Sequence, residues 1–211
     1  RSRRQRQMCI RDRFYFKEQL QPVPLPHQLS VDIGYLGKPK DETDQQLVQH
    51  RLLYYPSKKN EAMRKSDKVN VDEAQKVADL LNRIYTLTQK NFDPLRTVGV
   101  IVPYRNQIAM IRQEIEKTGN TALKDVCIDT VERYQGSQRD IIIYSFTVQH
   151  RYQLDFLTSN SFYEDDKLID RKLNVAITRA RKQLIILGNK SILSANPLFK
   201  ALIEQIPHHL R

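Results

Sequence analysis

Residues 171–188 read RKLNVAITRARKQLIILG, and this stretch decides the fold class. It predicts a helix over about residues 168–181, because at 100° per residue four apolar side chains share one face: Leu173, Ala176, Ile177 and Ala180. A strand from Gln183 to Leu187 follows almost at once, and its apolar residues are continuous rather than alternating. Such continuity is typical of a strand buried on both faces, as in a parallel sheet covered by helices.

The segments before this stretch extend the alternation of helix and strand. Asn70 and Glu73 have the spacing of a capping box, and an apolar stripe after them predicts a helix over about 71–88. We expect further strands at 97–102 (stopped by Pro103), 126–128 and 140–148, and a short one at 50–56. We also expect a helix that ends near Gly119, and its inner face consists of Tyr104, Ile108, Ile111 and Ile115. Residues 14–48 and 149–166 read as irregular, and two short helices flank Pro197. The alternation predicts an α/β fold with a mostly parallel sheet.

Ligands of such sheets bind where the strands end. The expected strands end at Pro103-Tyr104-Arg105, Asp129-Thr130, Thr147 and Gly188-Asn189. Thr130 and Tyr104 are candidates to contact the backbone or a base of a nucleic acid, together with Pro103. For Tyr104 the alternative is a half-buried aromatic on the inner face of its helix.

The polar residues of the helix at 168–181 are the strongest chemical signal. Asn174, Thr178 and Arg181 share one polar face, whereas Arg179 points in another direction, about 160° away from Arg181. One interpretation is an amphipathic helix with solvated arginines. The other assigns Arg179 to a γ-phosphoryl group, since an arginine offered across a cleft neutralises charge in phosphoryl transfer. We then assign Asn174 and Thr178 to nucleic-acid contact, and Arg181 to a structural or a nucleic-acid contact.

A second segment, Asp129 to Gly136, reads DTVERYQG. Gln135 could bond a phosphate-bound water or a phosphate oxygen, and Gly136 permits close approach to a ligand. Alone, a Gln-Gly pair is only a turn. The set is more specific: Thr130, Gln135, Gly136, Asp140 and the isoleucine run that follows.

No segment of the sequence has the phosphate-binding loop of a nucleotide hydrolase. Gly34-Tyr35-Leu36-Gly37-Lys38-Pro39 has only two residues between its glycines and Pro39 where a hydroxyl is needed, so we interpret it as a turn. No acidic pair follows an apolar strand, and no residues have metal-ligand spacing. We expect this chain alone not to hydrolyse ATP.

The formal net charge of +11 suggests an anionic partner. Residues 1–13 hold six Arg and one Asp, and without them the net charge is +6. This stretch is a disordered tail, a nucleic-acid-binding arm or, in the interpretation we favour, a non-native translated adapter that marks a truncated fragment. We expect three parts: the tail 1–13, an irregular lead-in 14–69 of the same domain, and a domain at 70–211.

The sequence gives no sign of a membrane or a disulfide framework. No apolar run approaches the roughly 20 residues of a membrane span, and no signal peptide is visible. Only Cys9 and Cys127 are present, which fits a reducing, cytoplasmic setting.

These segments resemble the superfamily 1 helicases of the 5′→3′ branch that contains senataxin and the nonsense-mediated-decay helicase. The match is to their second RecA-like domain. It rests on Gly99–Gln107 before motif V, Asp129–Asp140 as motif V, Arg171–Arg181 as motif VI followed by Leu184–Asn189, and Asn70–Ala74 upstream. There are departures: Ser137-Gln138 replaces the usual Arg-Glu, whose glutamate contacts the ribose, and 149–166 is longer than expected.

The resemblance implies a RecA-like three-layer sandwich without its own phosphate-binding loop, in an ATP-dependent DNA or RNA helicase. ATP with Mg²⁺ would be held mainly by a first RecA-like domain absent from this chain. Arg179 would be the arginine finger, Gln135, Gly136 and Gln138 would line the nucleotide cleft, and Thr130 would hold the phosphate backbone of a single strand.

Two other classes stay open. A non-catalytic nucleic-acid-binding module could have kept the fold and lost the motor. A protein that binds a small-molecule nucleotide is disfavoured because the chain has no Gly-rich loop.

Overall fold

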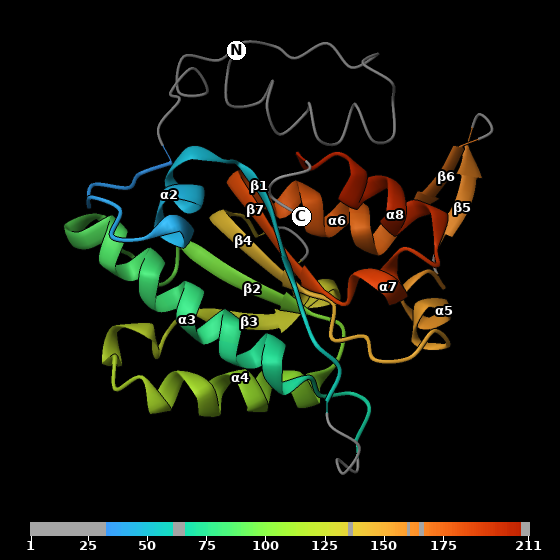
Figure 1. The fold of residues 1–211 in the computed structure, drawn as a ribbon, viewed down its shortest axis with the longest axis horizontal. Coiled ribbons are helices and arrows are strands. Elements are labelled where there is room, and N and C mark those ends of the chain that lie inside the picture. Colours follow the sequence, from blue (N-terminus) through green and yellow to red (C-terminus); the bar gives the residue numbers. More distant parts are fainter. Residues whose placement is uncertain (1–32, 61–65, 135–136, 160, 165–166, 208–211) are drawn as a thin grey trace.

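The computed structural model describes residues 33–60, 66–134, 137–159, 161–164 and 167–207. Five parallel strands form the central sheet in the order β1 (Leu52–Pro56), β7 (Ala180–Gly188), β4 (Arg139–Ser145), β2 (Val98–Val102) and β3 (Cys127–Thr130). Helices α3 (Val71–Thr88) and α4 (Arg105–Lys117) cover one face, and α6 (Arg171–Arg179) and α8 (Pro197–Glu204) lie on the other (Figure 1). The predicted α/β fold, a three-layer sandwich around a parallel sheet, is confirmed.

The central strands are buried as their composition predicts. All five residues of β2 are buried, as are the last five of β4 and the last six of β7. Because all the strands are parallel, their first residues lie at one end of the sheet and their last residues at the other. We call these ends the amino edge and the carboxyl edge.

Most expected elements are present, and α3 has the predicted bounds. The segment 149–166 was wrongly expected to be a loop. It contains α5 (Gln153–Leu157) and strand β5 (Ser161–Glu164), which pairs with β6 (Lys167–Asp170) as an antiparallel hairpin. The lead-in also contains a helix, α2 (Glu42–Gln49), whose first turn is capped by Asp41 accepting from the Asp44 amide. The last helical turns are α7 (Lys190–Leu193) and α8, on either side of Asn196.

Helix α6 is shorter at both ends than the sequence predicts. Asp170 caps it by accepting from the Leu173 amide at 2.6 Å, so residues 168–170 belong to β6. At the other end Ala180 pairs with Arg139, which draws residues 180–182 into β7. Arg181 therefore lies in a strand, and the predicted helical angle of about 160° between Arg179 and Arg181 is wrong.

The connection from β3 to β4 links the two edges of the sheet. β3 ends at Thr130 on the carboxyl edge and β4 begins at Arg139 on the amino edge, so the connection between them, which is described at 131–134 and 137–138, passes from one edge to the other. Within it, the 3-10 turn Val131–Tyr134 packs against α6. The Tyr134 hydroxyl donates to the Cys127 carbonyl at 2.6 Å and lies over Gly99, where any Cβ would collide with it. Gly99 thus provides the space in which this crossing packs on β2.

The segment Gly34–Pro39 is not a phosphate-binding loop. Gly34 has a φ of 101°, and the amides of Leu36 and Gly37 both donate to the Leu87 carbonyl at 2.7 and 2.8 Å. These amides are therefore used to fix the end of α3. In the described part of the chain, no helix combines the length and apolarity that a bilayer crossing needs.

Candidate functional site

Helix α6 delivers Arg179 to the amino edge. Near its start, Lys172 lies 3.5 Å from the Glu132 carboxylate and 4.4 Å from the ring centroid of Phe156, both beside the carboxyl edge. The helix then runs back along the sheet and ends at Arg179, directly before β7 begins. The position of Arg179 therefore follows from the immediate passage of helix into strand that the sequence predicts.

The Arg179 guanidinium contacts oxygen atoms that carry no formal charge. Its Nε donates to the Val175 carbonyl (3.2 Å), Nη1 to the Ser137 carbonyl (3.4 Å) and Nη2 to the Thr178 hydroxyl (3.1 Å). Among the described residues no carboxylate forms an ion pair with it. Partial burial lowers the pKa of this guanidinium, although an arginine remains charged. A cation thus lies in a partly desolvated place, and no described residue is its counter-ion.

Gln138 and Arg181 lie beside Arg179. Gln138 donates to the Thr178 carbonyl at 3.5 Å, and its Oε1 accepts from Arg181 Nε at 3.3 Å. Thr178 and Arg181, which we expected with the nucleic-acid residues, are therefore gathered with Arg179 and Gln138 at the amino edge. We call these four residues the arginine cluster. Gln135 and Gly136 lie outside the described residues.

The carboxyl edge brings together Thr130, Pro103 and Tyr104. Thr130 ends β3 and is the register partner of Val102, which directly precedes Pro103. Tyr104 is the N-cap residue of α4 and makes no side-chain cap, which leaves its ring to stack on Phe156 at a centroid distance of 5.3 Å. Tyr104 is only partly exposed. Its exposure is therefore compatible with a nucleic-acid contact and with a half-buried aromatic, and both interpretations stay predictions. Asn174 joins neither group: its Oδ1 is buried and has no partner among the described residues.

A buried carboxylate that we did not single out as a site residue organises the carboxyl edge. The sequence predicts a capping box, and Asn70 indeed accepts from the Glu73 amide. The Glu73 carboxylate, however, does not return to the Asn70 amide, which donates instead to Gln107 Oε1 at 2.8 Å. It accepts from the Ser57 and Ser145 hydroxyls and from the Thr147 amide at 2.6 to 2.8 Å. These partners lie at the end of β4 or just after β1 and β4, far from Glu73 along the chain, so they could not be seen in local sequence.

The Glu73 carboxylate holds the backbone of Thr147 in an unusual conformation, and its own pKa is raised. Thr147 has a φ of 58°, a region that β-branched residues rarely adopt, and the bond from its amide to Glu73 fixes it there. Burial raises the pKa of Glu73 to about 7, although its hydrogen bonds from Ser145, Thr147 and Ser57 oppose the shift. The carboxylate is therefore a structural element of the carboxyl edge, away from the arginine cluster.

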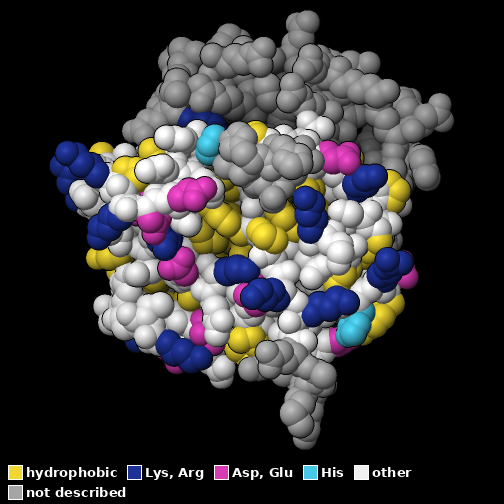
Figure 2. Space-filling view, viewed as in Figure 1, with side chains coloured by type: hydrophobic (Ala, Val, Ile, Leu, Met, Phe, Trp, Pro, Cys, Tyr) yellow, Lys and Arg dark blue, Asp and Glu magenta, His cyan; other side chains and the backbone are white. Residues whose placement is uncertain are grey.

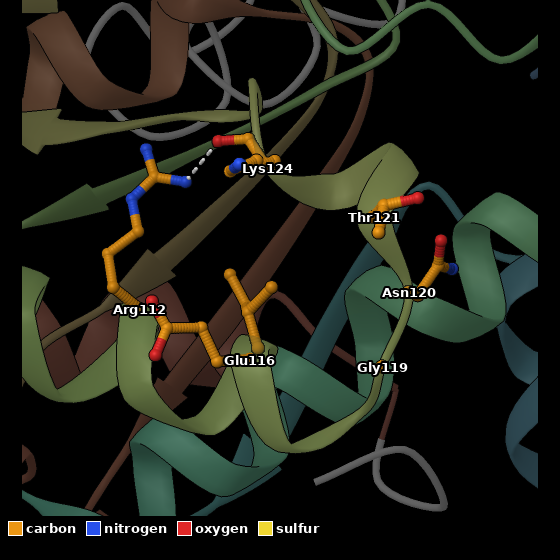
Figure 3. Close-up of a pocket in the computed structure, with 7 residues that line it drawn as sticks. Arg112, Glu116, Gly119, Asn120, Thr121 and Lys124 are labelled. Atoms are coloured by element: carbon orange, nitrogen blue, oxygen red, sulfur yellow. Dashed lines mark hydrogen bonds between the residues drawn. The ribbon is translucent and has the colours of Figure 1, made fainter.

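One hollow lies away from these residues. A hollow of about 200 Å³ lies at the end of α4, where Arg112 donates to the Lys124 carbonyl (Figure 3). None of the predicted site residues lines it. Basic side chains are spread over the face shown in Figure 2, with acidic ones among them, so surface charge alone does not mark a site. In the part of the chain that the structure describes, no group of three or more His, Cys, Asp or Glu could hold a metal ion.

Comparison of the sequence with known proteins finds helicases among its relatives. A family profile described as an AAA domain matches residues 7–191. The chain is 39% identical over 110 residues to Regulator of nonsense transcripts 1 of Dictyostelium discoideum, which covers 51% of this chain and 8% of that protein. It is 31% identical over 161 residues to Helicase sen1 of Schizosaccharomyces pombe, which covers 74% of this chain and 9% of that protein.

Two further similarities were found, one in sequence and one in structure. The chain is 39% identical over 114 residues to the human RNA helicase Mov10l1, covering 51% of this chain and 8% of that protein. Among solved structures, the C-terminal domain of a possible DNA helicase from Lactobacillus plantarum has a TM-score of 0.44 and 14% identity, covering 78% of this chain and 86% of that one. The chain spans less than a tenth of the length of these three curated relatives.

Proposed function

Because the chain belongs to the AAA-domain family, and within it to the senataxin and nonsense-mediated-decay branch of superfamily 1 helicases, we propose that it is the second motor domain of an ATP-dependent helicase or translocase. ATP with Mg²⁺ lies between its amino edge and a first RecA-like domain of the same protein. A single strand of DNA or RNA crosses its carboxyl edge.

The uncompensated charge of Arg179 carries this proposal. Arg83 provides the contrast within the same chain, since its guanidinium lies 2.7 to 2.8 Å from the carboxylates of Asp41, Asp44 and Asp79. That arginine is structural and fully neutralised. Among the described residues Arg179 has only carbonyl and hydroxyl partners, and a partly buried cation of this kind is stabilised by an anion that arrives from outside. The γ-phosphoryl group of ATP is such an anion, and an arginine finger accelerates its transfer by roughly 10³–10⁵-fold.

The neighbours of Arg179 support a nucleotide at the amino edge. Gln138 is exposed and stands where helicases of this branch have a glutamate that contacts the ribose, and an amide can bond the same hydroxyl. Gln135 and Gly136 precede it by two or three residues and belong to the same proposed cleft. We infer that Thr178 and Arg181 orient Gln138 and Arg179 rather than contact nucleic acid.

At the carboxyl edge, Thr130, Pro103 and Tyr104 are proposed to contact the nucleic acid. A hydroxyl and an aromatic ring at the ends of neighbouring strands fit a phosphate oxygen and a base. The buried Oδ1 of Asn174 disfavours a direct contact there. A cytoplasmic setting fits the unpaired state of Cys127.

The departure at Gln138 favours one second candidate, a nucleic-acid-binding module that has lost the motor. An amide in place of a carboxylate weakens the proposed ribose contact, and a protein that only binds does not need that contact. The presence of Arg179 argues against this candidate, because binding alone requires no finger.

ATP hydrolysis by the full-length protein that carries this chain tests the proposal. We expect single-stranded DNA or RNA to stimulate hydrolysis, and the more effective polymer identifies the nucleic acid on which the motor acts. Absence of hydrolysis with both polymers, in a protein that binds them, would replace the motor by the binding module.

A further inference from the structure

We propose that the aromatic side chains around α5 form a platform on which the bases of a single-stranded nucleic acid stack. This aromatic platform consists of Tyr104, His150, Tyr152 and Phe156. The inference rests on the proposed function, because it extends the nucleic-acid surface at the carboxyl edge. It adds recognition of bases to the backbone contact proposed for Thr130.

Helix α5 exposes aromatic side chains where a surface helix ordinarily has polar ones. Its buried side is formed by Gln153, Leu154 and Leu157. Phe156 on the helix is 46% exposed, and Tyr152 immediately before it is 60% exposed. Exposed apolar residues that occur singly need no explanation, but two large rings within five residues of each other suggest a binding surface.

The rings are held in fixed orientations. Tyr104 and Phe156 are stacked, with 5.3 Å between their centroids and 20° between their planes, and His150 and Tyr152 are stacked at 5.5 Å and 9°. The Tyr152 hydroxyl donates to Asp67. A ring that is already ordered loses little conformational entropy when a base stacks on it.

Buried Gln153 fixes the backbone beneath the platform. Its Oε1 accepts from the amides of Gln149 and His150 at 2.8 and 3.0 Å. Its Nε2 donates to the Asp67 carbonyl at 2.9 Å and approaches the Tyr104 hydroxyl at 3.5 Å. One buried amide therefore joins both stacked pairs, which makes the platform a single unit rather than two separate contacts.

The charges around the rings favour a nucleic acid over a protein partner. Arg105 and Arg151 are exposed next in sequence to Tyr104 and Tyr152. Lys172 lies 4.4 Å from the centroid of Phe156 and is paired with Glu132 at 3.5 Å, so its charge is already offset. The acids at the rings are Asp155, exposed on α5, and Asp67, which accepts from the Tyr152 hydroxyl. Rings interleaved with cations match bases interleaved with phosphates. The platform also adjoins Pro103 and Thr130, so one strand reaches both.

The expected occupant is single-stranded, because the bases of a duplex already stack on each other and do not offer their faces. Every base has a stacking face, so the platform gives little sequence preference. The rings therefore predict that the chain prefers single strands to duplexes and has little preference for sequence.

Binding of the 211-residue chain to fluorescent oligonucleotides tests the platform. The probes are oligo-dT, an abasic strand of the same length and a duplex. Tyr152→Leu and Phe156→Leu retain apolar volume but remove the rings, and Leu95→Ala is the control, an exposed apolar residue at the opposite edge. We expect each ring variant to lose about fivefold to tenfold in affinity for oligo-dT and almost none for the abasic strand. Leu95→Ala should bind both strands as the unmodified chain does.

A second readout uses the absence of tryptophan from the chain. Phe156→Trp introduces a single reporter whose fluorescence should be quenched by oligo-dT and not by the abasic strand, and Leu95→Trp should respond to neither. Equal affinities of the ring variants and the unmodified chain for oligo-dT would overturn the platform while leaving the proposed function intact. No binding of any probe by the unmodified chain would overturn the platform and the nucleic-acid contacts proposed for the carboxyl edge, whereas ATP hydrolysis by the full-length protein tests the motor separately.

Discussion

The two edges of one parallel sheet handle charge in opposite ways. On the α6 side of the amino edge, Arg179 and Arg181 find only carbonyl, hydroxyl and amide oxygens among the described residues. At the carboxyl edge, the buried Glu73 has three donors, and Lys172 faces Glu132. The α6 side of the amino edge is thus incomplete as it stands, although Lys182 and Asp140 form an ion pair elsewhere on that edge at 2.8 Å. At the carboxyl edge, by contrast, Glu73 and Lys172 both have partners.

This difference indicates what each edge can do. An incomplete cluster of cations becomes stable when an anionic ligand or a facing domain supplies the missing charge, which suits a step that recurs in a cycle. A satisfied edge keeps its shape whether or not a ligand is present, which suits a surface that must hold a strand repeatedly. The connection from β3 to β4 joins the two edges along the chain, and its described turn Val131–Tyr134 packs against α6, which ends at Arg179.

Substitution of Arg179 should give the largest difference between the two edges, because it should reduce ATP turnover and leave nucleic-acid binding almost unchanged. In the full-length protein, Arg179→Ala should lower ATP turnover by about 10³-fold or more, because it removes the only proposed finger, while affinity for single strands changes less than about twofold. Arg96→Ala is the control, an exposed arginine of the same edge outside the cluster. Turnover by Arg179→Ala equal to that of Arg96→Ala would remove Arg179 from the active site.

Glu73 should be the largest single contributor to stability at the carboxyl edge. Glu73→Ala leaves the Thr147 amide and two hydroxyls without their acceptor, and we expect the free energy of unfolding to fall by roughly 3 kcal/mol. Glu73→Gln should cost less, since the amide oxygen can still accept from Ser145 and Thr147 while its nitrogen donates to Ser57. Urea unfolding of the three proteins measures the order.

The pH dependence of stability tests the same residue. Burial raises the pKa of Glu73 from 4.5 to about 7, so between these values the folded protein binds more protons than the unfolded chain. The stabilisation is complete below pH 4.5 and is lost as pH rises through about 7, a fall of roughly 3 kcal/mol. Glu73→Gln should lack this contribution. Parallel pH profiles for the two proteins would show that Glu73 does not titrate in this range.

The sequence predicted the core better than the edges. Continuous apolar runs such as Ile141-Ile142-Ile143 identify buried parallel strands because burial on both faces leaves no polar position. The end of α6 was wrong by two residues because pairing of Ala180 with Arg139 overrides helical periodicity. The partners of Glu73 and the stacking of Tyr104 on Phe156 join residues tens of positions apart, which no local pattern encodes. The roles of Arg179, Gln135, Gly136 and Thr130 stay predictions.

The crossing between the edges depends on Gly99. Gly99→Ala places a methyl group against the Tyr134 hydroxyl and close to Arg139, which should destabilise the fold by about 1–3 kcal/mol. Tyr134→Phe removes the nearest atom and should rescue part of this loss in the double variant, a coupling that thermal unfolding of the four proteins measures. Strictly additive effects would show that Tyr134 moves aside freely and does not anchor the crossing.

The smallest expected effect is on nucleic-acid binding by Thr130. It distinguishes binding through a neutral hydrogen bond from binding through a charge. Burial alone would raise the pKa of Glu132, but bonds from its own amide and from the Thr130 side chain, with Lys172 nearby, hold it below its ordinary value. A phosphate approaching Thr130 therefore meets Glu132 as well, and Lys172 offsets that repulsion.

Thr130→Ala should weaken binding of single strands about fivefold with little dependence on sequence, and Thr130→Ser should bind nearly normally. Because a hydroxyl releases no counterion, Thr130→Ala should leave the slope of log affinity against log salt unchanged, whereas Lys172→Ala should reduce it by about one if Lys172 contacts a phosphate. Undiminished affinity of Thr130→Ala would refute the contact and leave the carboxyl edge to bind through its rings and cations alone.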